Sequence, residues 1–118
     1  MGYLVFTRDT LRAAYAFLNE TPPFSRWNLP DADDVDFKVA RTATHFGWYT
    51  VNGNNHLIAV SCAPVRDTQT LLATMAHEMI HVHERQAGAC RSGVQHGAAF
   101  RRWAAQVCRI HGFDPKDF

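Results

Sequence analysis

A long helix-forming segment at residues 68–86 constrains the fold of this chain more than any other part of the sequence. Asp67 or Thr68 can cap its start, and it continues to about Gln86 without a glycine or a proline. On a helical wheel that places His77 at zero, the apolar side chains centre at about 200°. These side chains are Leu72, Met75, Ala76 and Met79. We therefore predict a helix that packs on one face and presents polar chemistry on the other.

The polar face of this predicted helix carries residues that bind metals. His77 and His81 are four residues apart, so on a helix they lie one above the other and can share one ion. Glu78 lies about 100° from His77 around the axis. The pattern is H-E-x-x-H, in which two histidines ligate zinc and the glutamate accepts a proton from an activated water. The spacing predicts a zinc site with Glu78 as its general base.

A catalytic zinc site needs a third protein ligand and leaves one position open. Glu84 shares a face with His81, but it lies about 10 Å from His77 along the axis at a rise of about 1.5 Å per residue. One ion reaches both only if the helix is distorted, which makes Glu84 the weaker candidate. His96 is the stronger one, because a glycine-containing loop allows the chain to fold back and bring His96 to the first pair.

Three helices and three strands are predicted along the chain. A first helix over residues 7–20 has Thr7 as its N-cap, and it ends before two prolines that disfavour its continuation. A loop follows over residues 22–36, and a third helix is expected from about His96 to His111. The predicted strands cover residues 35–43, 46–51 and 56–61. This order predicts an α+β fold, in which a three-stranded mixed sheet packs against the helices.

The last two predicted strands form a hairpin. They are joined by Asn52-Gly53-Asn54-Asn55, and asparagine and glycine tolerate the positive φ that tight hairpin turns require. If the strand at residues 56–61 lies at the sheet edge that faces the site, an extended peptide can pair with it. His45 and His56 lie at strand ends and are predicted to be ordinary surface or hairpin residues.

Composition places the chain among ordinary globular proteins. Its 118 residues, 47% of them hydrophobic, suffice for one core and contain no repeat or linker, so we expect one domain over residues 1–118. The net charge of +1 gives no overall field that would attract nucleic acid or a membrane. No signal peptide and no membrane-spanning stretch is recognisable. Three cysteines without a C-x-x-C pair favour a reducing compartment, and we predict a cytoplasmic location.

Two stretches, LLATMAHEMIHVHE and SGVQHGAAFRRW, resemble the core of the SprT-like (Spartan-type) zinc metallopeptidases. That family shows H-E-x-x-H, a loop of similar length, and then a ligand histidine in an H-G-x-x-F context, which residues 96–100 match. The upstream order follows the family more loosely: a helix, an aromatic and proline-bearing loop with Phe24 and Trp27, and strands with a glycine near Gly47.

The resemblance implies a zinc endopeptidase with a minimal, gluzincin-like zincin core. By resemblance, His77, His81 and His96 bind Zn²⁺, and Glu78 acts as general base and then general acid. The implied partner is a protein or peptide substrate, with no membrane involved and no oligomeric state indicated. Many bacterial SprT-like proteins have a cysteine zinc ribbon after the core, but no paired cysteines follow the third predicted helix here. We therefore expect a single SprT-like domain without a C-terminal ribbon.

DNA is a further partner that the resemblance brings in. Spartan-type proteins that cut proteins crosslinked to DNA carry additional DNA-binding elements, so DNA-associated substrates are an open alternative for this chain. A second alternative is a non-catalytic, zinc-stabilised module that binds DNA or protein through late arginines, namely Arg91, Arg101, Arg102 and Arg109. Structural zinc sites are usually closed by four ligands and favour cysteine, so three histidines with a positioned glutamate favour the peptidase.

Three further residues have open roles at this stage. His83 falls at about 240° on the wheel, towards the apolar side, and is predicted to pack rather than to bind metal. Cys90, in the loop between the ligands, is either a fourth ligand or a free thiol. Peptide hydrolysis also needs a side chain that stabilises the oxyanion, and by residue type the candidates are Tyr49, His83 and Arg91.

Overall fold

The computed structural model describes residues 5–89 and 96–118, and within them the chain forms three α-helices and one sheet. The helices are α1 (Arg8–Asn19), α2 (Thr68–Gln86) and α3 (Ala98–His111). The strands are β1 (Val35–Ala40), β2 (Gly47–Asn52) and β3 (Asn55–Ser61). Short 3₁₀ turns occur at Phe24–Arg26, Ala32–Asp34 and Pro115–Asp117. The predicted α+β fold, with three helices and a three-stranded sheet, is confirmed.

The sheet is mixed, as predicted, and its strand order is β1-β3-β2. β3 pairs in parallel with β1 and antiparallel with β2. The β2–β3 hairpin closes at Asn52 opposite Asn55, and the positive φ of 65° at Gly53 supplies the tight turn. Because β3 has a neighbour on each side, residues 56–61 are not an edge to which a peptide could be added. Within the part of the chain that the structure describes, β1 and β2 are the outer strands of the sheet.

β1 is shorter than predicted. We expected a strand over residues 35–43, but the ladder ends at Ala40. Beyond it, the hydroxyl of Thr42 accepts a hydrogen bond from the backbone N–H of Thr44 at 3.2 Å, and the two hydroxyls lie 2.8 Å apart. Local bonds of this kind turn the backbone away from a sheet ladder. The prediction that residues 35–36 belong to the preceding loop was also wrong, because β1 already begins at Val35.

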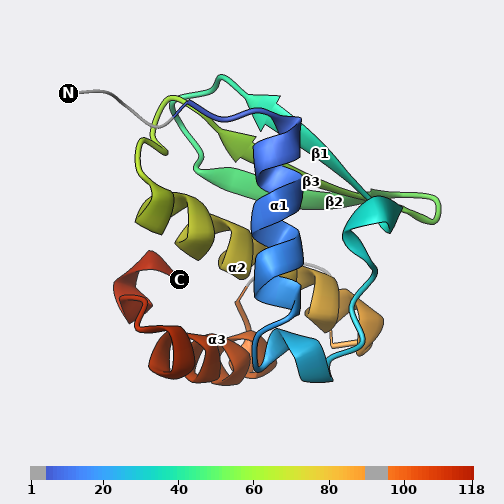
Figure 1. Cartoon of the computed structure of the whole chain (residues 1–118). Coiled ribbons are helices and arrows are strands. Elements are labelled where there is room, and N and C mark those ends of the chain that lie inside the picture. The colour runs from blue at the N-terminus through green and yellow to red at the C-terminus, as the bar shows by residue number, and fades with distance from the viewer. Residues whose placement is uncertain (1–4, 90–95) are drawn as a thin grey trace.

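α2 is the central helix of the fold, and it contacts α1, α3, β2 and β3. In Figure 1, α1 lies over the sheet and over α2, while α3 crosses below them. We predicted that α2 would bury one face, but its buried residues lie around nearly the whole circumference and include Glu78 and Glu84. The prediction was wrong because neighbours surround the helix, so that only the ends of a few polar side chains reach a cleft.

The helix ends follow from local sequence. Thr7 caps α1 and forms a reciprocal capping box with Thr10, as the N-cap prediction required. The Asp67 carboxylate caps α2 by accepting the Thr70 N–H at 2.7 Å. α3 ends at Gly112, whose φ of 78° is the left-handed conformation that favours glycine at a helix terminus. Among the described residues, no helix is both long enough and apolar enough to span a lipid bilayer.

Candidate metal centre

Three histidines meet where the start of α3 approaches α2. The ring centroids of His77 and His81 lie 5.1 Å apart, and His96 lies 4.8 Å from the first and 5.1 Å from the second. One nitrogen from each ring can be chosen such that all three atoms lie within 4.8 Å of one another. We call these residues the ligand cluster. The structure therefore brings together the three residues that the sequence predicted to bind one metal ion.

His96 reaches the cluster through a strained backbone position. We expected His96 to open the third helix, but α3 begins at Ala98, with Gly97 as its N-cap. His96 precedes the cap and has a φ of 53°, which is uncommon for a residue with a side chain. Its ring stacks on the buried ring of Phe100, with centroids 4.1 Å apart and planes 4° apart. Phe100 also contacts His77 and His81 on α2, so it forms an apolar floor beneath the ligand cluster.

The donor set of the ligand cluster suits a metal ion. Burial, and then the neighbouring imidazoles of His81 and His96, lowers the pKa of His77 from 6.5 to about 3. Burial and His81 also lower the pKa of His96, against an opposing effect of Glu84. Imidazoles held neutral in this way are in the form that binds metals. Three nitrogens around a tetrahedral zinc would lie about 3.4 Å apart, so small side-chain movements from the observed 4.8 Å suffice.

Glu78 lies beside the ligand cluster and is 5% exposed. Burial raises the pKa of its carboxyl group from 4.5 to about 8, which is close to the range in which a general base works at neutral pH. The start of β2 approaches it closely: a Cβ atom added to Gly47 would lie 3.6 Å from Glu78 Oε2. The first residue of β2 thus lies in close proximity to the Glu78 carboxylate, between α2 and the sheet.

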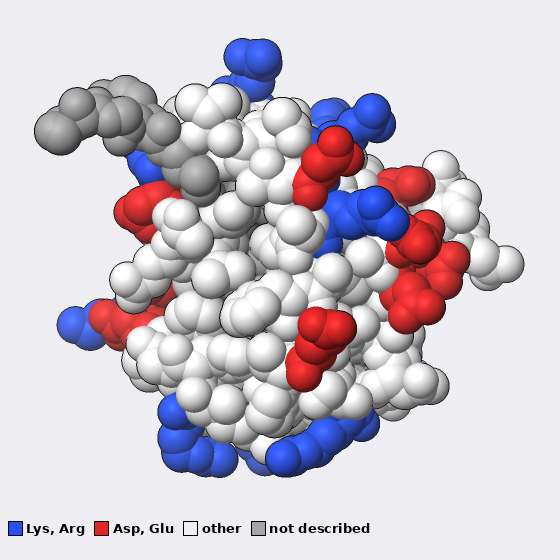
Figure 2. Space-filling view, viewed as in Figure 1, with Lys and Arg blue, Asp and Glu red and all other residues white. Residues whose placement is uncertain are grey.

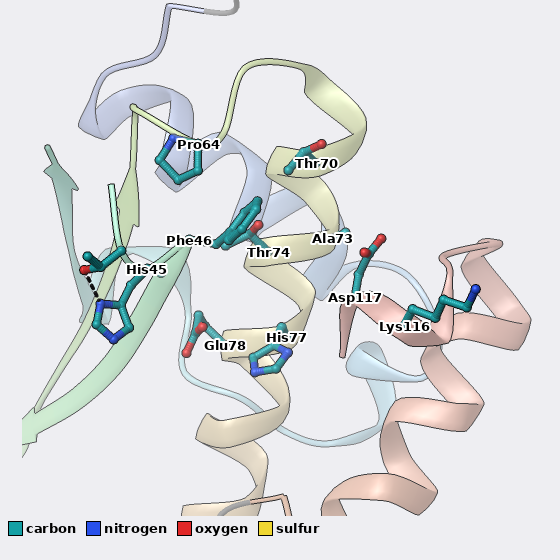
Figure 3. A pocket seen from close by; sticks show the side chains of 12 residues that line it. His45, Phe46, Pro64, Thr70, Ala73, Thr74, His77, Glu78, Lys116 and Asp117 are labelled. Atoms are coloured by element: carbon teal, nitrogen blue, oxygen red, sulfur yellow. Dashed lines mark hydrogen bonds between the residues drawn. The ribbon is translucent and has the colours of Figure 1, made fainter. Parts of the chain in front are cut away.

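Glu78 and His77 form part of the wall of a cleft of about 690 Å³. The opposite wall comes from the segment that leads into β2, including His45 and Phe46, and the C-terminal 3₁₀ turn contributes Lys116 (Figure 3). Phe46 is 54% exposed although it is a large apolar residue. A cleft of this size, with an exposed apolar ring on one wall and a buried carboxylate on the other, has the mixed lining of a ligand-binding site.

Two residues near the ligand cluster and the cleft have positions that sequence reasoning missed. His45, which we predicted to be an ordinary surface or hairpin residue, lines the cleft, and its Nδ1 lies 2.9 Å from the Thr44 hydroxyl. Glu84 is not part of the group of metal-binding atoms, and its Oε1 instead lies 3.1 Å from Nδ1 of His81. The spacing of three residues between His81 and Glu84 was the available signal. It indicated that the two side chains share a face of the helix, but it did not indicate a hydrogen bond between them.

His83 packs, as predicted, and does not join the ligand cluster. Its ring is stacked on Trp27, with centroids 4.1 Å apart and planes 6° apart, and meets Trp103 edge-on at 4.4 Å. We call these three residues the indole cluster. Burial lowers the pKa of His83, so its ring is held neutral. This position makes His83 unsuitable as the oxyanion-stabilising residue.

The other residues with open roles are placed as follows. The Tyr49 hydroxyl lies 2.6 Å from Nδ1 of His56 at the hairpin, so the structure does not bring Tyr49 into the cleft as an oxyanion-stabilising residue. Cys90 and Arg91 lie outside the described residues.

Comparison with known proteins gives one finding. A sequence model described as the SprT-like family matches residues 13–117, which is nearly the whole chain and includes every residue of the ligand cluster. No curated protein matches the chain.

Proposed function

The chain belongs to the SprT-like family, and from that premise we propose that it is a zinc-dependent endopeptidase. The observation that carries the proposal is the arrangement at the centre of α2. One nitrogen from each of three imidazoles lies within 4.8 Å of the others, and the buried Glu78 lies beside them in the wall of a cleft. This combination is what hydrolysis by an activated water requires: a metal with an open position and an adjacent base.

His77, His81 and His96 would hold the ion. Imidazole donors suit several transition metals, and zinc is proposed because three histidines in an H-E-x-x-H context are typical of zinc hydrolases. When bound there, zinc would lower the pKa of a water molecule towards 7 and polarise the scissile carbonyl group. The side chains of the fold supply the remaining steps.

Glu78 is the proposed proton carrier. Its carboxylate takes one proton from the attacking water, whose oxygen forms the new bond to the carbonyl carbon of the substrate. The bond between that carbon and the amide nitrogen then breaks, and Glu78 passes the same proton to the leaving amine. Burial suits the residue to both steps, because a pKa raised to about 8 lets the carboxyl group hold a proton and release it near neutral pH.

The substrate is proposed to be an extended segment of protein. β2 offers a free edge, and its first residue, Gly47, lies against Glu78 at the cleft. A peptide added to this edge would gain backbone hydrogen bonds and would pass the catalytic carboxylate. The exposed ring of Phe46 lines the same cleft and would contact an apolar side chain of the substrate. We therefore propose that the peptide pairs with β2 and not with residues 56–61, the strand considered from sequence.

Substitution of Glu78 by glutamine tests the mechanism. The variant keeps the shape of the side chain but cannot accept a proton, so we expect cleavage of an unfolded test protein to fall about 10²–10⁴-fold. Zinc content, measured on the same preparation by atomic emission, should remain equal to that of wild type. Activity equal to that of wild type would contradict the role of Glu78. Loss of zinc together with activity would show that Glu78 acts in metal binding instead.

DNA is proposed as a second partner because of the surface of α3. Arg101, Arg102 and Arg109 are exposed, and no ion pair joins them to an acidic residue in the described ranges. In Figure 2, Lys and Arg side chains gather along the lower rim of the molecule, over α3. Cleavage of one substrate with and without single-stranded DNA tests this partner. Salt-dependent DNA binding without any proteolysis would favour a non-catalytic module.

A further inference from the structure

A buried carboxylate supports the ligand cluster from behind. Glu84 is 7% exposed, and its Oε1 lies 3.1 Å from Nδ1 of His81, one helical turn earlier on α2. A carboxylate is costly to bury unless a partner compensates for the lost water. In the described part of the chain, the hydrogen bond of this carboxylate goes to His81. The hydrogen bond to His81 therefore compensates for the burial of Glu84, and it requires that the His81 ring keep this position.

The contact fixes which nitrogen of His81 is free. An ionised carboxylate can only accept hydrogen bonds, so Nδ1 of His81 must carry the proton that it donates to Glu84. In a neutral imidazole, the other nitrogen then has an available lone pair. Nε2 is on the side of the ring away from Nδ1, so it is the atom left to join the nitrogens of His77 and His96. Without Glu84, either nitrogen of His81 could carry the proton.

We propose that Glu84 is a positioning residue, which holds His81 as the Nδ1-protonated tautomer with Nε2 directed to the metal. This inference rests on the proposed zinc site, since it concerns how one of the ligands is presented. Groups that accept the second N–H of a ligating histidine orient the ring and raise its basicity, and their loss typically weakens metal binding about 10–100-fold. Glu84 contributes this effect without touching the ion.

The geometry separates this role from that of a ligand. The group of nitrogens that could hold an ion consists of His77, His81 and His96, and no oxygen of Glu84 belongs to it. Glu84 lies one turn beyond His81 on α2, whereas His77 lies one turn before it. Glu84 therefore contacts His81 without being one of the three residues whose atoms could hold the ion.

Two substitutions test the inference through metal affinity. Glu84→Ala removes the acceptor, and we expect the Kd for Zn²⁺, measured by competition with a chromophoric chelator, to rise about 10–100-fold. Glu84→Gln keeps an oxygen acceptor of the same reach and should lose clearly less affinity. His83→Ala is the matched control: it alters the same helix one residue away, touches no ligand, and should leave the Kd unchanged. Zinc affinity of Glu84→Ala equal to that of wild type would overturn the inference.

A spectroscopic measurement distinguishes positioning from general stability. Long-range ¹H–¹⁵N spectra of the metal-free protein report which imidazole nitrogen carries the proton. We expect His81 to be Nδ1-protonated in wild type and to shift towards the Nε2-protonated form in Glu84→Ala. An unchanged tautomer in that variant would count against the inference even if its zinc affinity fell. Weak zinc binding in Glu84→Ala together with an inactive wild type would instead leave the inference standing and remove the peptidase proposal.

Discussion

Two histidine-centred regions share α2, and they use the same side chain in opposite ways. In the ligand cluster the rings of His77 and His96 meet at an angle of 61°, and nitrogens of all three members converge. In the indole cluster the ring of His83 lies flat on Trp27, and its buried Nδ1 has no hydrogen-bond partner among the described residues. In the ligand cluster the nitrogens converge on a common point, whereas in the indole cluster the flat face of the His83 ring packs against an aromatic side chain.

The difference is decided by what α3 brings to each face of α2. His83 follows His81 by two positions, and this spacing turns its side chain about 200° around the helix from that of His81. The approach to α3 delivers His96 to one face, and a later turn of α3 delivers Trp103 to the other. A histidine on this helix therefore acquires its chemistry from its partner across the interface, and changes in the two clusters should have separable effects.

The largest difference between loss of zinc affinity and loss of stability is expected for His96→Ala. Removing one of three imidazoles leaves two ligands, so zinc affinity should fall by more than the about 10–100-fold that loss of a residue supporting a ligand costs. Proteolysis should be lost with the metal. The measurement is chelator competition for Zn²⁺, accompanied by a thermal melt in excess chelator, where the variant and wild type should unfold at similar temperatures. Retention of wild-type affinity would show that the three histidines do not form one site.

The opposite pattern is expected at the indole cluster. His83→Ala leaves a gap between Trp27 and Trp103 and should lower the free energy of unfolding by about 2–4 kcal/mol. Zinc affinity of the folded protein should not change. Urea unfolding of the metal-free protein gives the first quantity and chelator competition gives the second.

A second variant at this position tests whether the His83 ring serves only to pack. His83→Phe keeps a flat aromatic ring and removes a buried nitrogen that has no partner in residues 5–89 and 96–118, so its stability should lie within about 1.5 kcal/mol of wild type. A large loss of stability in His83→Phe would mean that the nitrogens of His83 contribute a contact beyond packing.

Sequence signals that act within one helix or turn predicted the structure better than signals that depend on contacts between distant parts of the chain. Caps at Thr7 and Asp67, the Gly53 turn and the four-residue spacing of His77 and His81 act within one element, so the sequence alone specifies them. Placing His96 with the pair required a long-range contact, which the glycine-containing loop allowed and the resemblance to a family supported.

The misplaced features all depend on neighbours distant in sequence. Helical periodicity gave α2 one buried face, but α1, α3 and the sheet together cover most of its surface, which no pattern within the helix records. The same holds for β3, whose central place follows from a parallel pairing with β1, and for Glu84, whose hydrogen bond depends on how the His81 ring is turned. His45 lines the cleft only because β2 begins beside Glu78.

A more local effect is expected at Gly47, which lies beside Glu78 but belongs to neither cluster. A Cβ atom there would lie 2.7 Å from the Ala59 carbonyl oxygen and 3.0 Å from Thr74 Cγ2, so the backbone of β2 must shift in Gly47→Ala. Overpacking of this kind costs about 1–3 kcal/mol, which urea unfolding would measure. The shift occurs beside Glu78, so peptide cleavage should slow, whereas the nitrogens of the ligand cluster lie on α2 and before α3 and should bind Zn²⁺ as in wild type. If Gly47→Ala also lowered the affinity for Zn²⁺, the sheet would help to position the ligands. Changes in packing and changes in metal binding would then not be separable on this side of α2.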